Sequence, residues 1–182
     1  MKIKIRLLHL SAITVAVLVA GPAGAATYLW NVAAPGANNW NVNANWLPAT
    51  GNPSTADTAV FNATGVATSP TTVNNIVSVN TTVAGLLYTN VTGYHVTQIP
   101  STVTLTVSGS FTNGGLVGGS SGFNTTNVMT GSGTFYASST IFHIGNNNSS
   151  GGTASALLDV SGLNNFVYNA SGGTFKIGRA HV

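Results

Sequence analysis

Leu105-Thr106-Val107-Ser108-Gly109 is the stretch that decides the fold, because it returns as Leu158-Asp159-Val160-Ser161-Gly162. Both copies alternate apolar and polar residues and then end at a glycine. A period of two is typical of a β-strand with one buried face, and the glycine marks the turn that follows the strand. The sequence therefore predicts β-structure built from recurring units of strand and turn.

A second pair of similar segments supports a repeat. Tyr136-Ala137-Ser138 precedes Phe142-His143-Ile144-Gly145, and Tyr168-Asn169-Ala170-Ser171 precedes Phe175-Lys176-Ile177-Gly178. Recurring strand-and-glycine units are the sequence signature of a solenoid. We therefore predict an all-β fold, a right-handed parallel β-helix (β-solenoid) with a Trp-rich cap at its N-terminus. The alternative is an antiparallel β-sandwich, which also has short alternating strands and frequent turns.

The expected strands are short and dispersed along the chain, and no segment has the period of a helix. The clearest one places Val103, Leu105 and Val107 on one face and threonines on the other. Asparagine and threonine side chains are expected to form ladders between coils. Residues 146–152 are expected to form a polar loop. The full set of expected strands is 73–79, 83–88, 94–99, 103–107, 134–137, 140–144, 156–160 and 166–168.

The charge of the central domain differs from that of the whole chain. The formal net charge is +3, but no Lys or Arg occurs between residues 26 and 175. Charged residues make up 4% of the chain, against about 25% in an ordinary soluble domain. The domain therefore offers no basic patch to phosphates, which excludes nucleic acid as a partner. The five cations are Lys2, Lys4, Arg6, Lys176 and Arg179.

Residues 1–26 have the pattern of a secretory signal peptide. Three cations precede an apolar run over 7–20, Gly21-Pro22 ends that run, and Ala23-Gly24-Ala25 supplies small residues for cleavage. The apolar run is shorter than the roughly 20 residues that span a bilayer. We therefore expect the mature domain to be exported and not embedded in a membrane. The chain has no cysteine, so its stability must come from packing and hydrogen bonds.

The last residues are expected to be non-native. Ile177-Gly178-Arg179-Ala180-His181-Val182 is the translation of a common sequencing adapter in one reading frame. We therefore expect residues 177–182 to be an adapter-derived tail on a fragment that lacks a C-terminal anchor or barrel.

Trp30, Trp40 and Trp46 all lie within residues 27–61. They admit two interpretations. One is a ligand-binding platform on which sugar rings stack, as in a carbohydrate-binding module. The other is a hydrophobic plug that closes the first coil, where an open solenoid end would expose apolar side chains and unpaired strand edges. We favour the plug, because the three residues lie where a cap is needed.

Catalytic and metal sites are hard to assemble from this composition. Glycoside hydrolysis generally uses two carboxylates, and only Asp57 and Asp159 are present. Both are expected to be structural, Asp57 in a turn and Asp159 on an outward strand position. His95 and His143 are too few for a zinc site, and His143 is expected to face solvent. We therefore predict no catalytic residues, no metal and no cofactor, with a polysaccharide-active β-helix enzyme as a remote alternative.

The order Trp30, Asn39-Trp40, Asn45-Trp46, Pro53 and Asp57-Thr58-Ala59-Val60-Phe61 resembles the start of bacterial proteins with autotransporter-associated β-strand repeats. Phe142-His143-Ile144-Gly145 and Leu158-Asp159-Val160-Ser161-Gly162 look like their repeat units. Such proteins are exported and surface-associated, and some end in an outer-membrane barrel or a sorting signal of the PEP-CTERM kind. The resemblance implies a parallel β-helix passenger without catalytic residues.

These observations predict four segments and one function. The segments are a signal peptide at 1–26, a Trp-rich cap at 27–61, β-solenoid repeats at 62–176 and the non-native tail at 177–182. The expected function is that of a non-catalytic structural or adhesive protein, outside the cell or on the outer-membrane surface of a Gram-negative-type bacterium. Surface glycans or matrix are the expected partners.

Overall fold

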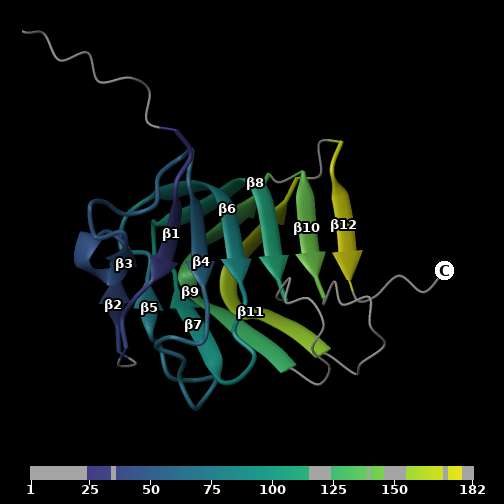
Figure 1. The fold of residues 1–182 in the computed structure, drawn as a ribbon. Helices are drawn as coiled ribbons and strands as arrows, with labels where there is room; N and C mark the ends of the chain where they lie inside the picture. The colour runs from purple at the N-terminus through teal and green to yellow at the C-terminus, as the bar shows by residue number, and fades with distance from the viewer. Residues whose placement is uncertain are drawn as a thin grey trace, which may run out of the picture.

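The chain forms a parallel β-solenoid. The computed structural model describes residues 24–33, 36–114, 124–138, 140–145, 155–169 and 172–177. This described part is all-β and coils through about four turns (Figure 1). The predicted polar loop at 146–152, nearly all of the predicted signal peptide and all but one residue of the predicted tail lie outside it. The elements are β1 Thr27–Trp30, β2 Asn38–Asn39, a 3-10 turn at Asn43–Asn45, β3 Trp46–Leu47, β4 Thr58–Phe61, β5 Asn75–Ile76, β6 Thr81–Tyr88, β7 Tyr94–Gln98, β8 Thr104–Asn113, β9 Asn124–Ala137, β10 Ile141–Ile144, β11 Ser155–Tyr168 and β12 Thr174–Ile177.

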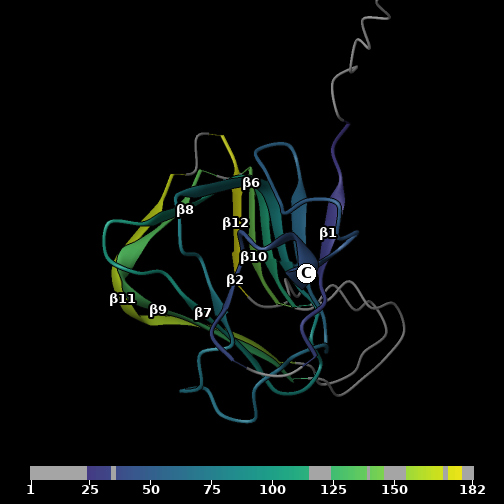
Figure 2. The same ribbon diagram turned by 90° about the vertical axis from the view of Figure 1, so that its left-hand side faces the viewer.

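The coils stack into three faces, because the longer strands bend and contribute to two of them. Face A consists of β1, β4, the second halves of β6 and β8, β10 and β12, which lie side by side in Figure 1. Face B consists of the first halves of β6 and β8 and the ends of β9 and β11. Face C consists of β2, β5, β7 and the starts of β9 and β11. Figure 2 looks down the stack, and the chain turns clockwise as it recedes from its N-terminal end, which makes the coil right-handed.

Neighbouring coils pair in parallel, which confirms the predicted solenoid and makes the sandwich alternative wrong. Among the described strands, β3 is the exception, since it pairs antiparallel with β1 at the N-terminal edge of face A. An isolated antiparallel bridge joins Ala67 to Tyr94. Parallel strands need long connections, and here the other two faces of each coil supply them.

Glycine allows the strands to turn the corners between faces. At Gly109, where β8 passes from face B to face A, a Cβ atom would lie 2.5 Å from the backbone oxygen of Ala84 in the preceding coil. At Gly131, where β9 leaves face C, φ is +108°, a region that side chains other than glycine rarely adopt. These two corners therefore require a residue without a side chain, which explains why the alternating stretch at 105–109 ends at glycine.

The core consists of inward side chains that form columns along the stack. One column on face A runs through Ala59, Leu86, Phe111, Phe142 and Phe175, which are register neighbours in successive strands. The ring centroids of Phe111 and Phe142 are 4.6 Å apart, and those of Phe142 and Phe175 are 5.1 Å apart. On face B, Leu105, Phe135 and Phe166 form an equivalent column.

Only one of the two sequence repeats is also a structural repeat. Phe142-His143-Ile144 and Phe175-Lys176-Ile177 pair residue for residue on face A, so this repeat corresponds to a structural one. The opening repeat does not: Leu105 to Val107 lies on face B, whereas Leu158 and Asp159 pair with β9 on face C. Each copy is a strand that runs toward a corner glycine. The motif therefore specifies a local turn and not a fixed position in the coil.

Most predicted strands are present, but their extents differ. β8 and β11 continue through their corner glycines, because the backbone pairing is kept beyond each bend. The start of β9 was not predicted, since Asn124 to Thr130 is rich in polar residues on both faces. The cap boundary at residue 61 does not interrupt the sheet, because β4 pairs with β6.

Candidate functional site

The three tryptophans lie together inside the first coil. Trp30, Trp40 and Trp46 are all buried, with at most 2% of each side chain exposed. The ring of Trp46 packs edge-on against Trp30 and Trp40, with centroids 5.0 and 5.5 Å apart. Phe61 from β4 contacts all three rings. The cluster therefore belongs to the hydrophobic core.

Hydrogen bonds hold two of the three indoles in place. Trp40 Nε1 donates to Asn75 Oδ1 at 2.8 Å, and Trp46 Nε1 donates to the Trp40 carbonyl at 2.7 Å. Trp30 Nε1 is buried and has no partner among the described residues. A sugar-stacking platform needs an exposed ring face, and none of these rings offers one. The arrangement supports the plug and gives no support to the platform.

Buried asparagines form a polar seam inside the stack. The sequence did not indicate which asparagines would be buried. Asn127 Nδ2 donates to Asn113 Oδ1 at 2.7 Å, and Asn127 Oδ1 accepts from the backbone of His95 at 2.9 Å. Asn75 Nδ2 donates to Asn74 Oδ1 at 2.9 Å. All four asparagines are at most 1% exposed. Asn113 and Asn127 lie on faces A and C of one coil, so their bond closes a corner inside the coil and is not the predicted ladder between coils. The contact between coils runs from Asn127 Oδ1 to the backbone of its register neighbour His95.

Asp57 is fixed in a turn, as predicted. Its carboxylate accepts hydrogen bonds from the Ala26 backbone at 2.9 Å, the Ser54 backbone at 2.9 Å and the Ser54 hydroxyl at 2.5 Å. Burial by itself would raise the pKa of Asp57, but these hydrogen bonds lower it below its ordinary value. The side chain thus ties the start of β1 to the turn before β4.

Asp159 is engaged separately, in the last described coil. Its Oδ1 accepts hydrogen bonds from the Ser161 hydroxyl at 2.6 Å and the Ser161 backbone at 2.8 Å, and both lower the pKa of Asp159. Because Asp57 belongs to the first coil, the stack places the two carboxylates near opposite ends. The structure therefore does not bring them together on one sugar bond, which a glycosidase requires.

His95 is buried against aromatic rings. Its ring centroid lies 5.0 Å from Phe61 and 6.1 Å from Tyr88, and its Nε2 donates to the Asn62 carbonyl at 2.6 Å. Nδ1 has no partner among the described residues. Burial lowers the pKa of His95 to about 4, although the bond to Asn62 acts in the opposite direction.

The expectation that His143 faces solvent is wrong. His143 aligns with Lys176 as predicted, but it is only 8% exposed. The strand register determines which side of the sheet the His143 side chain points to. It does not determine whether other parts of the chain cover that side. Within the described residues, no group of three or more His, Cys, Asp or Glu side chains could hold a metal ion.

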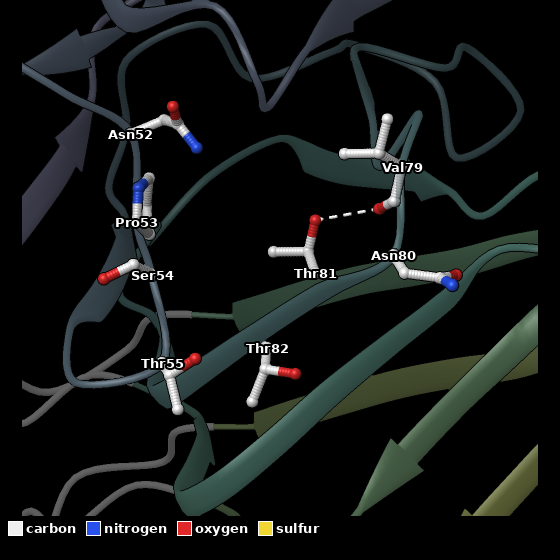
Figure 3. A pocket seen from close by; sticks show the side chains of 8 residues that line it. All are labelled: Asn52, Pro53, Ser54, Thr55, Val79, Asn80, Thr81 and Thr82. Carbon is white, nitrogen blue, oxygen red and sulfur yellow. Dashed lines mark hydrogen bonds between the residues drawn. The ribbon is translucent and has the colours of Figure 1, made fainter.

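An open hollow lies where the first coil meets β6 (Figure 3). Its volume is about 230 Å³. One wall is the segment that precedes β4, and the other leads into face B. The lining is made of amides, hydroxyls and two apolar side chains: Asn52, Pro53, Ser54, Thr55, Val79, Asn80, Thr81 and Thr82. Sequence reasoning missed this site, because none of these residues belongs to a recognisable motif.

The outer surface of face B continues from this hollow along the stack. Thr82 pairs with Thr106, and Thr106 pairs with Tyr136. These side chains point outward, because their neighbours along each strand, such as Val83 and Leu105, are buried. Adjacent strands lie about 4.8 Å apart. The result is a straight outward row of two hydroxyls and an aromatic ring, which we call the face B row (Thr82, Thr106 and Tyr136).

The fold and these contacts define the chain as a β-solenoid with a closed aromatic cap and an almost uncharged surface. No protein-family model, curated protein or solved structure matches it. Among the described residues, no helix has the length and apolar character needed to cross a membrane.

The hydrogen bonds in the cap predict that two Trp→Phe substitutions lower the free energy of unfolding by different amounts. Trp40→Phe should lower the free energy of unfolding by about 1–3 kcal/mol more than Trp30→Phe. Both changes remove the same atoms, but Trp40→Phe leaves Asn75 Oδ1 without its buried donor, whereas Trp30→Phe removes an N–H that has no partner in the described residues. Denaturant unfolding followed by far-UV circular dichroism measures the difference, and equal costs would contradict this geometry.

His95 predicts a pH dependence of stability. Its pKa is 6.5 in the unfolded chain and about 4 in the folded one, so the unfolded state takes up the proton first as the pH falls. The free energy of unfolding should be independent of His95 above about pH 6.5. Between that pH and pH 4 it should fall by about 3 kcal/mol. Denaturant unfolding measured across this pH range should show a smaller fall in the free energy of unfolding for His95→Gln than for the wild-type chain. An identical fall in the two proteins would show that His95 is not responsible.

Proposed function

We propose that this chain is a non-catalytic structural or adhesive protein, exported and displayed at a bacterial cell surface in the manner of an autotransporter passenger. One observation carries the proposal: a β-solenoid with a nearly uncharged outer surface, whose two carboxylates are engaged by their own turns. Such a molecule presents a long, regular and neutral face.

The surface chemistry supports adhesion through hydrogen bonds and shape. Outward threonines on faces A and B, such as Thr112, Thr82 and Thr106, offer hydroxyl groups at the spacing of the coils. The 26–175 segment has no Lys or Arg to steer a charged partner over a distance. Recognition by this surface would therefore depend on contact, without long-range attraction of a charged partner.

The positions of the acidic residues favour a role without catalysis. Asp57 and Asp159 lie in different coils and each accepts hydrogen bonds from a nearby serine. An acid–base pair needs two carboxylates on one bond, with pKa values that differ, whereas both of these carboxyl groups have a lowered pKa. The burial of the tryptophans removes the support for a module that binds sugars through those rings.

The first 26 residues support export, because they combine a basic start, an apolar run and a small-residue cleavage pattern. The absence of cysteine agrees with a fold that is stabilised by stacking. A location outside the cell would give such a neutral face access to matrix or to neighbouring cells.

Adhesion by this chain should be nearly independent of salt. The purified protein should be retained on polysaccharide-coated surfaces with less than about a twofold change between about 0.1 and 1 M NaCl, where the Debye length shrinks from about 10 to 3 Å. Retention can be measured by surface plasmon resonance, with a serum albumin layer as the control. Binding that disappears at high salt, or polysaccharide cleavage that Asp159→Asn abolishes, would contradict the proposal.

A further inference from the structure

The hollow between the first coil and β6 has walls that are held in place by internal hydrogen bonds. The Ser54 hydroxyl donates to Asp57, and the Thr81 hydroxyl donates to the Val79 carbonyl at 2.9 Å. Asn80 Oδ1 accepts from the backbone of Thr104 at 2.9 Å. These contacts tie both walls to neighbouring segments, so the shape of the hollow is set before any ligand arrives.

Three other side chains in the lining keep their hydrogen-bonding capacity. Asn52, Thr55 and Thr82 have no hydrogen-bond partner among the described residues. Figure 3 shows Asn52 on one side of the hollow and Thr82 on the other. An amide offers donors and an acceptor, and each hydroxyl can do either. Ligand hydroxyl groups, which also donate and accept, match this set.

The lining has no charged side chain. The nearest carboxylate along the chain, Asp57, already accepts three hydrogen bonds. An anionic ligand would lose its hydration here without gaining a cation, and a cationic ligand would find no free carboxylate. The site therefore selects for a neutral ligand.

The face B row extends the site beyond the hollow. From Thr82 the row continues to Thr106 and then to Tyr136, which is half-buried and outward-facing. The Tyr136 hydroxyl accepts from Asn169 Nδ2 at 3.3 Å, which restrains the ring. An aromatic ring supplies an apolar surface beside polar groups, which suits the C–H face of a sugar.

We propose that the hollow and the face B row bind a neutral saccharide chain that lies along the solenoid axis. This inference rests on the proposed adhesive function and gives it a partner class. The hollow is smaller than the roughly 300–1,000 Å³ of typical ligand pockets, so it accommodates one sugar residue. The next residues of the chain lie against Thr106 and Tyr136, and binding is weak for each copy of the protein.

The test uses the purified full chain and arrays of neutral glucans, mannans and galactans, with uronic-acid and sulfated polysaccharides beside them. Isothermal titration then gives the affinity for the best neutral oligosaccharide. Thr82→Val and Tyr136→Ala should each weaken that affinity by about 3- to 10-fold, the loss expected for one hydrogen bond or one modest apolar contact. Thr112→Val is the matched control, because Thr112 is an outward threonine on face A. Thermal unfolding checks that each variant is folded.

The outcomes separate this site from the proposed function. Binding of neutral saccharides that falls in Thr82→Val and Tyr136→Ala, and is unchanged in Thr112→Val, supports the site. Adhesion that persists equally in all three variants overturns the site and leaves the adhesive function standing. Exclusive binding of acidic polysaccharides, or no saccharide binding by the wild-type chain, also overturns the site. If the wild-type chain is retained on none of the coated surfaces, the proposed adhesive function itself is overturned.

Discussion

The stacking of one coil's inward side chains on those of the next is the interaction on which the rest of this structure depends. Each buried aliphatic or aromatic side chain contributes about 1.5–3 kcal/mol, and the stacked, buried rings of Phe111 and Phe142 repeat that contribution in successive coils. Parallel backbone pairing satisfies the peptide groups between coils. Since these two terms provide the stability, the outer surface is free to be uncharged and the chain needs no disulfide.

The same interaction leaves the N-terminal edge of the first described coil to be covered, because no other coil of the described residues packs against it. The tryptophan cluster covers this edge, because Trp30, Trp40 and Trp46 all contact Phe61, whose register neighbour in the next coil is Tyr88. β3 completes the edge by pairing antiparallel with β1. The asparagine seam is the second adaptation: Asn113 occupies an inward position next to Tyr88, and its side-chain oxygen accepts a hydrogen bond from Asn127, whereas its Nδ2 has no partner among the described residues.

The sequence allowed the fold class to be predicted, because alternation and glycine corners are local properties. It did not allow the position of each unit in the coil to be predicted. Leu105 and Leu158 each begin a stretch that alternates and ends in Val-Ser-Gly, but they lie on different faces, because strands that run toward a corner glycine occur on more than one face. The burial of His143 depends on tertiary covering, which no local pattern encodes. The tryptophans could be located in the cap because composition marks a solenoid end, but the argument for a plug over a platform depends on their burial in the structure.

The hollow and the face B row could not be predicted for a different reason. Asn52 and Thr82 are far apart in sequence, and each belongs to the commonest residue types of this chain. Only the stacking of the first coil against β6 brings them to the two sides of one space. The proposed function therefore depends on the coil register as much as the fold does, since a shift of one residue would turn Thr82, Thr106 and Tyr136 inward.

Engineered cysteine pairs test the coil register most directly, because the chain has no cysteine of its own. Leu87 and Thr112 are outward register neighbours in adjacent coils on face A, and parallel neighbours lie within the roughly 4.4–6.8 Å between Cα atoms that a disulfide spans. The double variant Leu87→Cys with Thr112→Cys should oxidise to an intramolecular disulfide in the folded protein, as seen by mass spectrometry. The pair Leu87→Cys with Thr106→Cys, whose partners lie on different faces, should not. Equal oxidation of both pairs, or of neither, would contradict the stacked-coil account.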